Sequence, residues 1–125
     1  MKKTVLALIA LSLVLVGCGG GATSLYRWGE FPQQTYNYMS ERSKVSPLEQ
    51  IARLEKDIEK SKAEKNRAVP PGLYGHLGLL NLDVQNSQRA AMYFQLEKQV
   101  YPESTVLMNR LLQRMGATNS NEVKK

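Results

Sequence analysis

The sequence predicts an all-α fold, a short helical array in which one helical hairpin is flanked by capping helices. Apolar residues recur at three- and four-residue spacing before and after residues 71–104, which is the pattern of one apolar helix face. Turn-forming residues separate these stretches, as at Pro70-Pro71-Gly72. The chain has 125 residues, of which 42% are hydrophobic, and this is enough for one small packed domain.

An N-terminal secretory signal peptide is predicted over residues 1–17. Two lysines after the first methionine precede an apolar run from Thr4 to Val16, which is the layout of such a peptide. As a helix this run would reach roughly 20 Å, too short for the ~30 Å hydrocarbon core of a membrane. Its removal takes away both lysines, so the mature chain has 15 basic against 11 acidic residues and a net charge of +4.

Cys18 is the predicted lipidation site. Leu15-Val16-Gly17-Cys18 resembles the lipobox of bacterial lipoproteins, in which the thiol is acylated with fatty acids such as palmitate and the cysteine becomes the first mature residue. Two or three acyl chains hold a protein on a membrane far more firmly than one. The alternative is an incidental thiol at the end of an ordinary signal peptide.

The residues after Cys18 predict the destination and the attachment of the protein. By resemblance to enterobacterial lipoproteins, Gly19 in place of Asp indicates export to the outer membrane, with the domain facing the periplasm. Small residues without periodicity follow, so residues 18–24 are predicted to form a flexible lipidated tether. The folded domain is then expected over residues 25–116.

Most aromatic residues of the mature chain lie between residues 25 and 38, and they leave two interpretations open. An exposed aromatic surface around Trp28 would bind a partner or rest at the membrane interface, because Trp and Tyr combine an apolar body with a polar tip. Alternatively, the segment folds back and buries its rings on the helices. The second interpretation is favoured, because so small a domain needs its large apolar side chains for the core.

A helix is predicted over residues 47–66. Ser46-Pro47-Leu48-Glu49 combines an N-cap serine, a proline at the first helical position and the glutamate of a capping box. The charged faces of this helix mix basic with acidic residues, which indicates a solvated surface and argues against a nucleic-acid partner. Its apolar face is formed by Leu48, Ile51, Leu54 and Ile58.

The stretch from Pro71 to Ser104 has the 34-residue length of a tetratricopeptide repeat and resembles its pattern. Two antiparallel helices are predicted, joined by a turn at residues 83–86. Two small residues would let them approach closely, and Tyr74 and Phe94 would fill the space between them. A generic helical hairpin is the alternative, since Asn81 stands where the repeat has an aromatic residue. The matching positions are Tyr74, Leu77, Gly78, Ala90, Phe94 and Pro102.

A last helix is predicted over residues 104–115, with Ser104 as its N-cap, Gly116 as its stop and a disordered polar tail over residues 117–125. Since one repeat cannot bury both of its faces, this helix and the helix over 47–66 are expected to cap the hairpin on either side. The apolar side of the last helix is formed by Leu107, Leu111, Leu112 and Met115.

Neither an enzyme nor a metal or cofactor site is predicted, and no small-molecule substrate is expected. His76 is the only histidine and Cys18 the only cysteine, while a zinc site built from these residue types needs three or four ligands. No nucleophile motif accompanies His76, so its expected role is structural. Carboxylates such as Glu55 and Glu59 lie on a lysine-rich face, without the desolvated setting that acid-base catalysis needs.

Three parts of the chain together resemble one family of small bacterial lipoproteins. These parts are the lipobox, the aromatic segment from Leu25 to Tyr38, and Pro70-Pro71-Gly72-Leu73-Tyr74-Gly75-His76-Leu77-Gly78. The family is known as domain of unknown function 4810, and the resemblance covers nearly all of the mature chain. It implies a component of an envelope or surface-export assembly, with a lipoprotein similar to the curli secretion channel as a candidate partner, and it implies no reaction.

We therefore expect an outer-membrane lipoprotein that binds another envelope protein. The expected contact surface is the groove face of the hairpin together with the aromatic segment, because stacked helical repeats present extended concave surfaces. The alternative is a structural tether between the outer membrane and peptidoglycan, suggested by the lipid anchor, the basic helix over 53–67 and the terminal Lys124-Lys125. The expected partner-binding residues are Trp28, Tyr74, Asn81 and Gln85.

Overall fold

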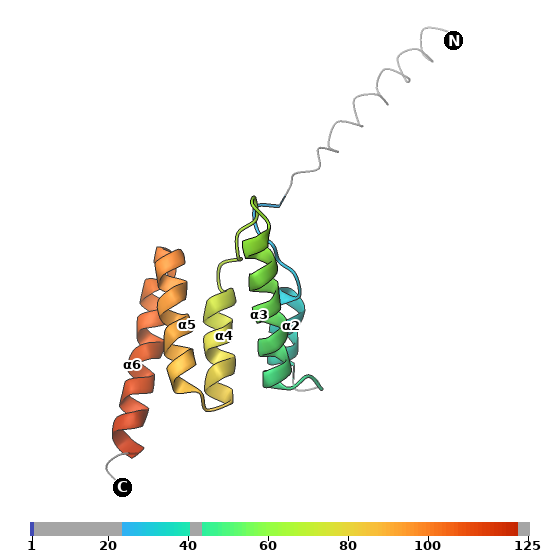
Figure 1. Ribbon diagram of the computed structural model, residues 1–125. Coiled ribbons are helices and arrows are strands. Elements are labelled where there is room, and N and C mark those ends of the chain that lie inside the picture. Colours follow the sequence, from blue (N-terminus) through green and yellow to red (C-terminus); the bar gives the residue numbers. More distant parts are fainter. Residues whose placement is uncertain (2–23, 41–43, 123–125) are drawn as a thin grey trace.

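The computed structural model describes residues 1, 24–40 and 44–122, and within these residues the fold is all-α, as predicted. No strand forms in this part of the chain apart from an isolated bridge between Tyr26 and Ala68. A 3-10 turn, η2 (Pro102–Ser104), separates the last two helices. The helices, labelled in Figure 1, are α2 (Phe31–Met39), α3 (Pro47–Ala63), α4 (Leu73–Asp83), α5 (Ser87–Val100) and α6 (Thr105–Glu122).

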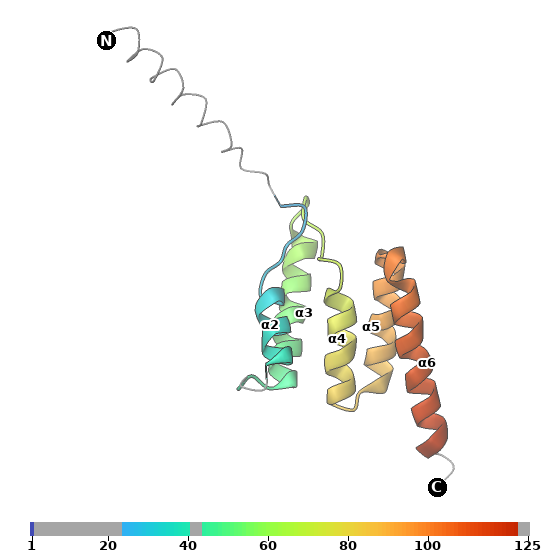
Figure 2. The ribbon, with the colours of Figure 1, turned by 180° about the vertical axis from the view of Figure 1, so that it is seen from behind.

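Each helix packs on the next one along the chain, so the domain is a short array of alternating up and down helices. In Figure 1, α2 lies behind α3 and α6 lies behind α5, while Figure 2, seen from the other side, shows α2 and α6 in front. The central helix α4 packs against both α3 and α5. The predicted arrangement, a hairpin with a helix on either side, is confirmed, and α2 adds a further helix.

The start of α3 is the one that its sequence predicts. The hydroxyl of Ser46 accepts a hydrogen bond from the backbone N–H of Glu49 at 3.2 Å, and proline occupies the first helical position. The carboxylate of Glu49 turns to Arg53 instead of completing the capping box. The helix ends at Ala63, and of its predicted apolar face Leu48 alone is exposed.

The α4–α5 hairpin depends on one close approach. A Cβ atom added to Gly78 would lie closer to the ring of Phe94 than real Cβ atoms approach other atoms, so only glycine fits there. Ala90 is fully buried at the same contact between helices. Gly78 and Ala90 therefore let α4 and α5 approach closely, as predicted.

The predicted turn at residues 83–86 closes the hairpin as a Schellman motif. The N–H of Asn86 donates to the carbonyl of Asn81 at 2.8 Å, and the N–H of Gln85 donates to the carbonyl of Leu82 at 2.9 Å. Gln85 adopts a left-handed conformation with φ +59°, a place where glycine is the usual residue. The side chain of Asn86 then caps α5 by accepting from the N–H of Arg89 at 3.1 Å.

Two apolar clusters hold the array together. The larger one joins α3, α4 and α5, and the smaller one joins α4, α5 and α6, so α4 and α5 belong to both. The larger cluster contains Ile51, Leu54, Ile58, Val69, Leu73, Tyr74, Leu77, Leu80 and Tyr93. The smaller one contains Ala90, Phe94 and Met108, with Leu79, Leu82, Leu111, Leu112 and Met115 packed against it.

Helix α6 begins within one residue of its predicted start and ends later than predicted. It begins at Thr105 after the 3-10 turn, and Met108 is its most buried apolar residue, whereas the predicted Leu107 is exposed. The predicted stop at Gly116 is wrong, because the helix continues to Glu122. Gly116 does not have the positive φ of a helix-ending glycine, so the backbone passes through it without a turn.

Candidate protein-binding surface

Six rings form a continuous row that joins four parts of the chain, and we call it the aromatic row. Each ring centroid lies between 5.1 and 6.5 Å from the next, the spacing of favourable aromatic pairs. Trp28 and Phe31 stack almost in parallel, and most other pairs meet edge to face. In order, the row consists of Tyr101, Tyr26, Trp28, Phe31, His76 and Tyr38.

The N-terminal segment is held in place for this row by the linker between α3 and α4. The N–H of Ala68 donates to the carbonyl of Leu25, and the N–H of Arg27 donates to the carbonyl of Ala68, both at 2.9 Å. The ring of Tyr26 thereby lies beside that of Tyr101, whose hydroxyl donates to the carbonyl of Val69. Tyr26 and Trp28, in the segment before α2, thus extend the aromatic row beyond the rings that lie on the helices.

A tight turn directs the chain from this segment into α2. Gly29 has φ +47°, and a Cβ atom on it would collide with the carboxylate of Asp57. That carboxylate, almost fully buried on α3, accepts the N–H of Glu30 at 2.6 Å and so caps the first turn of α2. The rings of Trp28 and Phe31 are fixed on either side of this turn.

Part of the aromatic segment covers the core, and part of it stays exposed to solvent. Phe31 packs against the larger apolar cluster, as the favoured interpretation predicted. Trp28 keeps 45% of its surface exposed, and Tyr36 and Tyr38 are also exposed. Trp28 and Tyr38 of the row are therefore available for contact, while Phe31, His76 and Tyr101 are fixed by the core.

Two of the four predicted contact residues are exposed, and two are not. Trp28 lies on the surface beside Phe31, and Gln85 lies on the surface in the turn that follows α4. The exposure expected of Tyr74 and Asn81 is wrong, because they keep 5% and 1% of their surface. The central position of α4 causes this, since its neighbours cover it on two sides.

Both buried residues have structural partners. Tyr74 stacks on Tyr93 at 6.4 Å, and the side-chain amide of Asn81 donates to the carbonyl of Leu77 at 2.8 Å. The hairpin therefore offers Gln85 at its tip, and the aromatic row takes the place of Tyr74 and Asn81 as the candidate contact surface.

His76 and Tyr101 are the residues of the row that the sequence did not single out for contact. Of the two, His76 is the ionisable residue on a helix. It keeps 7% of its surface, lies between the rings of Phe31 and Tyr38, and its Nε2 has no hydrogen-bond partner among the described residues. Burial lowers the pKa of its imidazole, against the smaller opposing effect of Asp83. Burial and the same carboxylate raise the pKa of Tyr38. The aromatic richness of residues 26–38 was the only sequence signal for this site.

The described residues hold no cluster of three or more histidine, cysteine or acidic side chains able to bind a metal ion. None of the helices in this part of the chain has the length and apolar character needed to span a bilayer. The predicted signal peptide, Cys18 and all of the tether except Ser24 lie outside the described residues, so these remain predictions.

A comparison with family models gives one match. The model described as Domain of unknown function (DUF4810) matches residues 25–111, which include the aromatic row and both apolar clusters. No curated protein and no solved structure matches the chain.

Proposed function

The chain belongs to the family described as Domain of unknown function (DUF4810), and for this member we propose the role of an outer-membrane lipoprotein that binds another envelope protein through its aromatic row. The lipobox around Cys18 supports the anchor, and Gly19 after it supports the destination. The α4–α5 hairpin acts in this proposal as a tetratricopeptide-like unit, with α3 and α6 as its neighbours.

The observation that carries the binding role is the combination of exposed and fixed rings in one row. A half-exposed Trp28 stacked on a core-packed Phe31 is a rigid aromatic side chain of the kind that dominates protein interfaces. The buried Nε2 of His76 supplies a polar group without a partner at the same row.

The candidate partner is a lipoprotein similar to the curli secretion channel, within an envelope or surface-export complex. Neither a catalytic group nor a nucleic-acid partner belongs to this proposal.

Anchor and surface are tested separately. Intact-mass analysis of the protein from membranes should give a lipid increment that the Cys18→Ala variant lacks. An unmodified Cys18 refutes the anchor.

For the surface, Trp28→Ala is compared with Met92→Ala, since Met92 on α5 is exposed to a similar degree but lies away from the row. We expect Trp28→Ala to weaken recovery of the envelope partner by roughly thirtyfold, as for an interface hot spot of about 2 kcal/mol. Met92→Ala should leave recovery unchanged. Equal effects of the two substitutions would refute the aromatic row as the contact surface.

A structural tether to peptidoglycan is the second candidate, and the direction of α6 favours it. The chain enters the described domain at one end, and α6 leads away toward the opposite end (Figure 1). The domain would then act as a spacer. Sacculi boiled in detergent test this, because protein found only in the soluble fraction excludes covalent attachment.

A further inference from the structure

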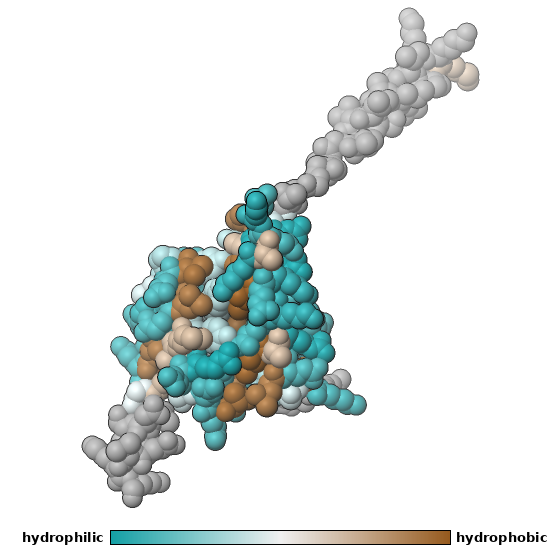
Figure 3. All heavy atoms as spheres, viewed as in Figure 1, coloured by the Kyte–Doolittle hydropathy of each residue, from teal (hydrophilic) through white to brown (hydrophobic). Residues whose placement is uncertain are grey.

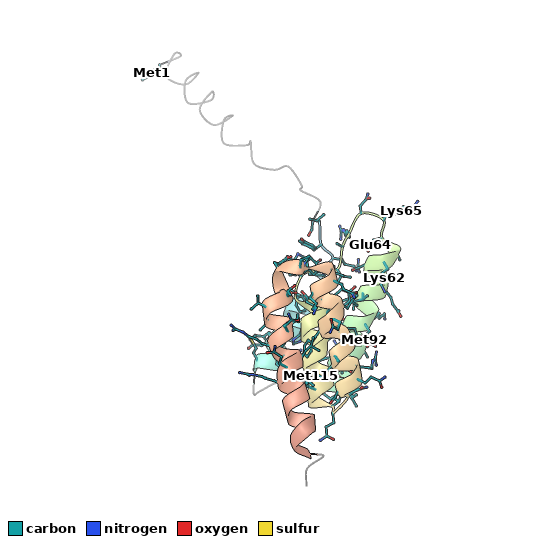
Figure 4. All side chains as sticks on the ribbon, turned by 90° about the vertical axis from the view of Figure 1, so that its left-hand side faces the viewer. Met1, Lys62, Glu64, Lys65, Met92 and Met115 are labelled. Carbon is teal, nitrogen blue, oxygen red and sulfur yellow. The ribbon has the colours of Figure 1, made fainter. Side chains whose placement is uncertain are left out.

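One end of the domain gathers the entering chain and a group of basic residues, and we call it the anchored end. It consists of residues 24–27, the last turn of α3 and the turn over residues 64–68. Two backbone hydrogen bonds to Ala68, both 2.9 Å, bring the entering chain to this turn. Figure 4 shows Lys62, Glu64 and Lys65 at the end where the chain enters.

The basic side chains here outnumber the acidic ones. Glu64 forms ion pairs with two arginines, Arg27 and Arg67. Lys62 and Lys65 are exposed and form no ion pair or hydrogen bond with any described residue. The anchored end holds five basic residues against the single acid Glu64, which gives it a charge of +4.

The exposed Glu59 lies one helical turn before Lys62 on α3 and offsets part of this charge. Lys60 is paired with the buried Asp57, so it adds little free charge. Leu25 keeps 65% of its surface exposed beside the turn, which adds an apolar side chain next to the lysines. Figure 3 shows that α3 and this end of it present mainly hydrophilic residues, while hydrophobic ones gather over α4 and α5.

We propose that the anchored end lies on the membrane, with Lys62 and Lys65 on the anionic phospholipid headgroups of the leaflet that holds the Cys18 lipid. The proposal rests on the lipid anchor of the proposed function. Residues 19–24 separate the anchor from Leu25, and a chain of this length spans at most about 25 Å. Charges interact over roughly 8 Å at physiological salt, which is shorter than this reach. The lysines therefore interact with the headgroups only when the domain lies close to the membrane surface.

This orientation assigns different tasks to the two surfaces. The anchored end faces the lipid, and the aromatic row runs from it along α2 and α4 toward the opposite end. The exposed Tyr38 of the row, near the end of α2, and the neighbouring exposed Tyr36 would be held away from the membrane, accessible to a partner.

The test is lysine acetylation of the full lipidated protein in nanodiscs, read lysine by lysine by mass spectrometry. Discs of phosphatidylglycerol and phosphatidylcholine are compared with discs of phosphatidylcholine alone. We expect the labelling rates of Lys62 and Lys65 to fall about fivefold in the anionic discs, the change expected for a lysine held at such a surface. Lys44 and Lys56, exposed elsewhere on the domain, are internal controls that should not change. High salt should restore labelling.

Variants separate this proposal from the anchor itself. In the double variant Lys62→Glu and Lys65→Glu, hydrogen exchange at residues 64–68 should be equally fast in anionic and in neutral discs. The matched pair Lys44→Glu with Lys56→Glu should preserve the difference between the two kinds of disc. Equal labelling of all four lysines in both discs overturns the proposal, while incorporation into the discs, checked by intact mass, reports on the lipid anchor alone.

Discussion

Glu97, near the end of α5, caps the beginning of α4 through Gly72. Its Oε1 accepts the N–H of Gly72 at 2.7 Å, and its Oε2 accepts the N–H of Gly75 at 3.2 Å. Gly72 cannot provide a side-chain cap itself, and a carboxylate at a helix N-terminus also interacts favourably with the helix dipole. Asp57 of α3 does the same for α2, so both pairs of helices use the second helix to cap the first.

Loss of this cap should destabilise the domain. Glu97→Ala leaves two N–H groups without acceptors in a place that is 1% exposed, and we expect the free energy of unfolding to fall by about 2–4 kcal/mol, with a smaller loss for Glu97→Gln. Urea denaturation measures it. Glu103→Gln on the exposed turn η2 is the control and should change stability by less than about 0.5 kcal/mol. Equal effects at both positions would show that the cap contributes nothing.

Substitution of alanine for Gly78 and for Gly116 should change the stability of the protein in opposite directions. Gly78→Ala forces a methyl group into the ring of Phe94, and we expect a loss of roughly 2–3 kcal/mol. Gly116→Ala in α6 meets nothing within 4 Å and should stabilise the helix by up to about 1 kcal/mol. Thermal unfolding followed by circular dichroism gives both signs. Phe94→Leu should partly rescue Gly78→Ala, since it shortens the clashing side chain, and a failure of this rescue would place the strain elsewhere.

Gln85→Gly should make the protein more stable. A non-glycine residue at φ +59° is strained, and glycine removes a cost of about 1 kcal/mol. Asn86→Ala, one residue away, removes the N-cap of α5 and should cost about 1 kcal/mol. Because Gln85 is also an expected contact residue, partner recovery is measured on the same variant. A more stable protein with weaker recovery would assign the strained side chain to binding.

His76 should make stability depend on pH in the weakly acidic range. Its pKa in the folded protein is lowered by burial, so the unfolded chain takes up the proton first as the pH falls below 6.5. The stability is fully present above that value and decreases as the pH falls toward the folded-state pKa. His76 is the only histidine, so His76→Gln should remove this slope between pH 6.5 and 5 in urea denaturation. A slope that persists in the variant would have to come from carboxylates.

The sequence was informative wherever one local pattern determines the outcome. The Ser46 cap, the turn at residues 83–86 and the approach of Gly78 to Phe94 are each decided by a few neighbouring residues or by a known repeat spacing. Periodicity also located α3, although its last predicted residues form a turn because the N–H of Glu64 closes the helix on Lys60 and Ser61.

What could not be predicted depends on contacts between distant segments. The expectation that Tyr74 and Asn81 lie on an exposed groove is wrong, because the packing of α3 and α5 around α4 buries them. The aromatic row needs Tyr101 next to Tyr26 and His76 next to Tyr38, and no local pattern brings these pairs together. The same holds for Glu97 and Asp57, which are buried and cap helices other than their own.

The pairing of the entering chain with Ala68 has a mechanical consequence. A force on the lipid anchor would reach the domain at Ser24. It would load first the hydrogen bond between Ala68 and Leu25 and then the bond between Arg27 and Ala68. The bond between Glu30 and Asp57 would bear the load next. The α4–α5 hairpin lies further along the chain than these attachments, so detachment of residues 24–30 would lengthen the connection to the membrane while the two helices stay packed.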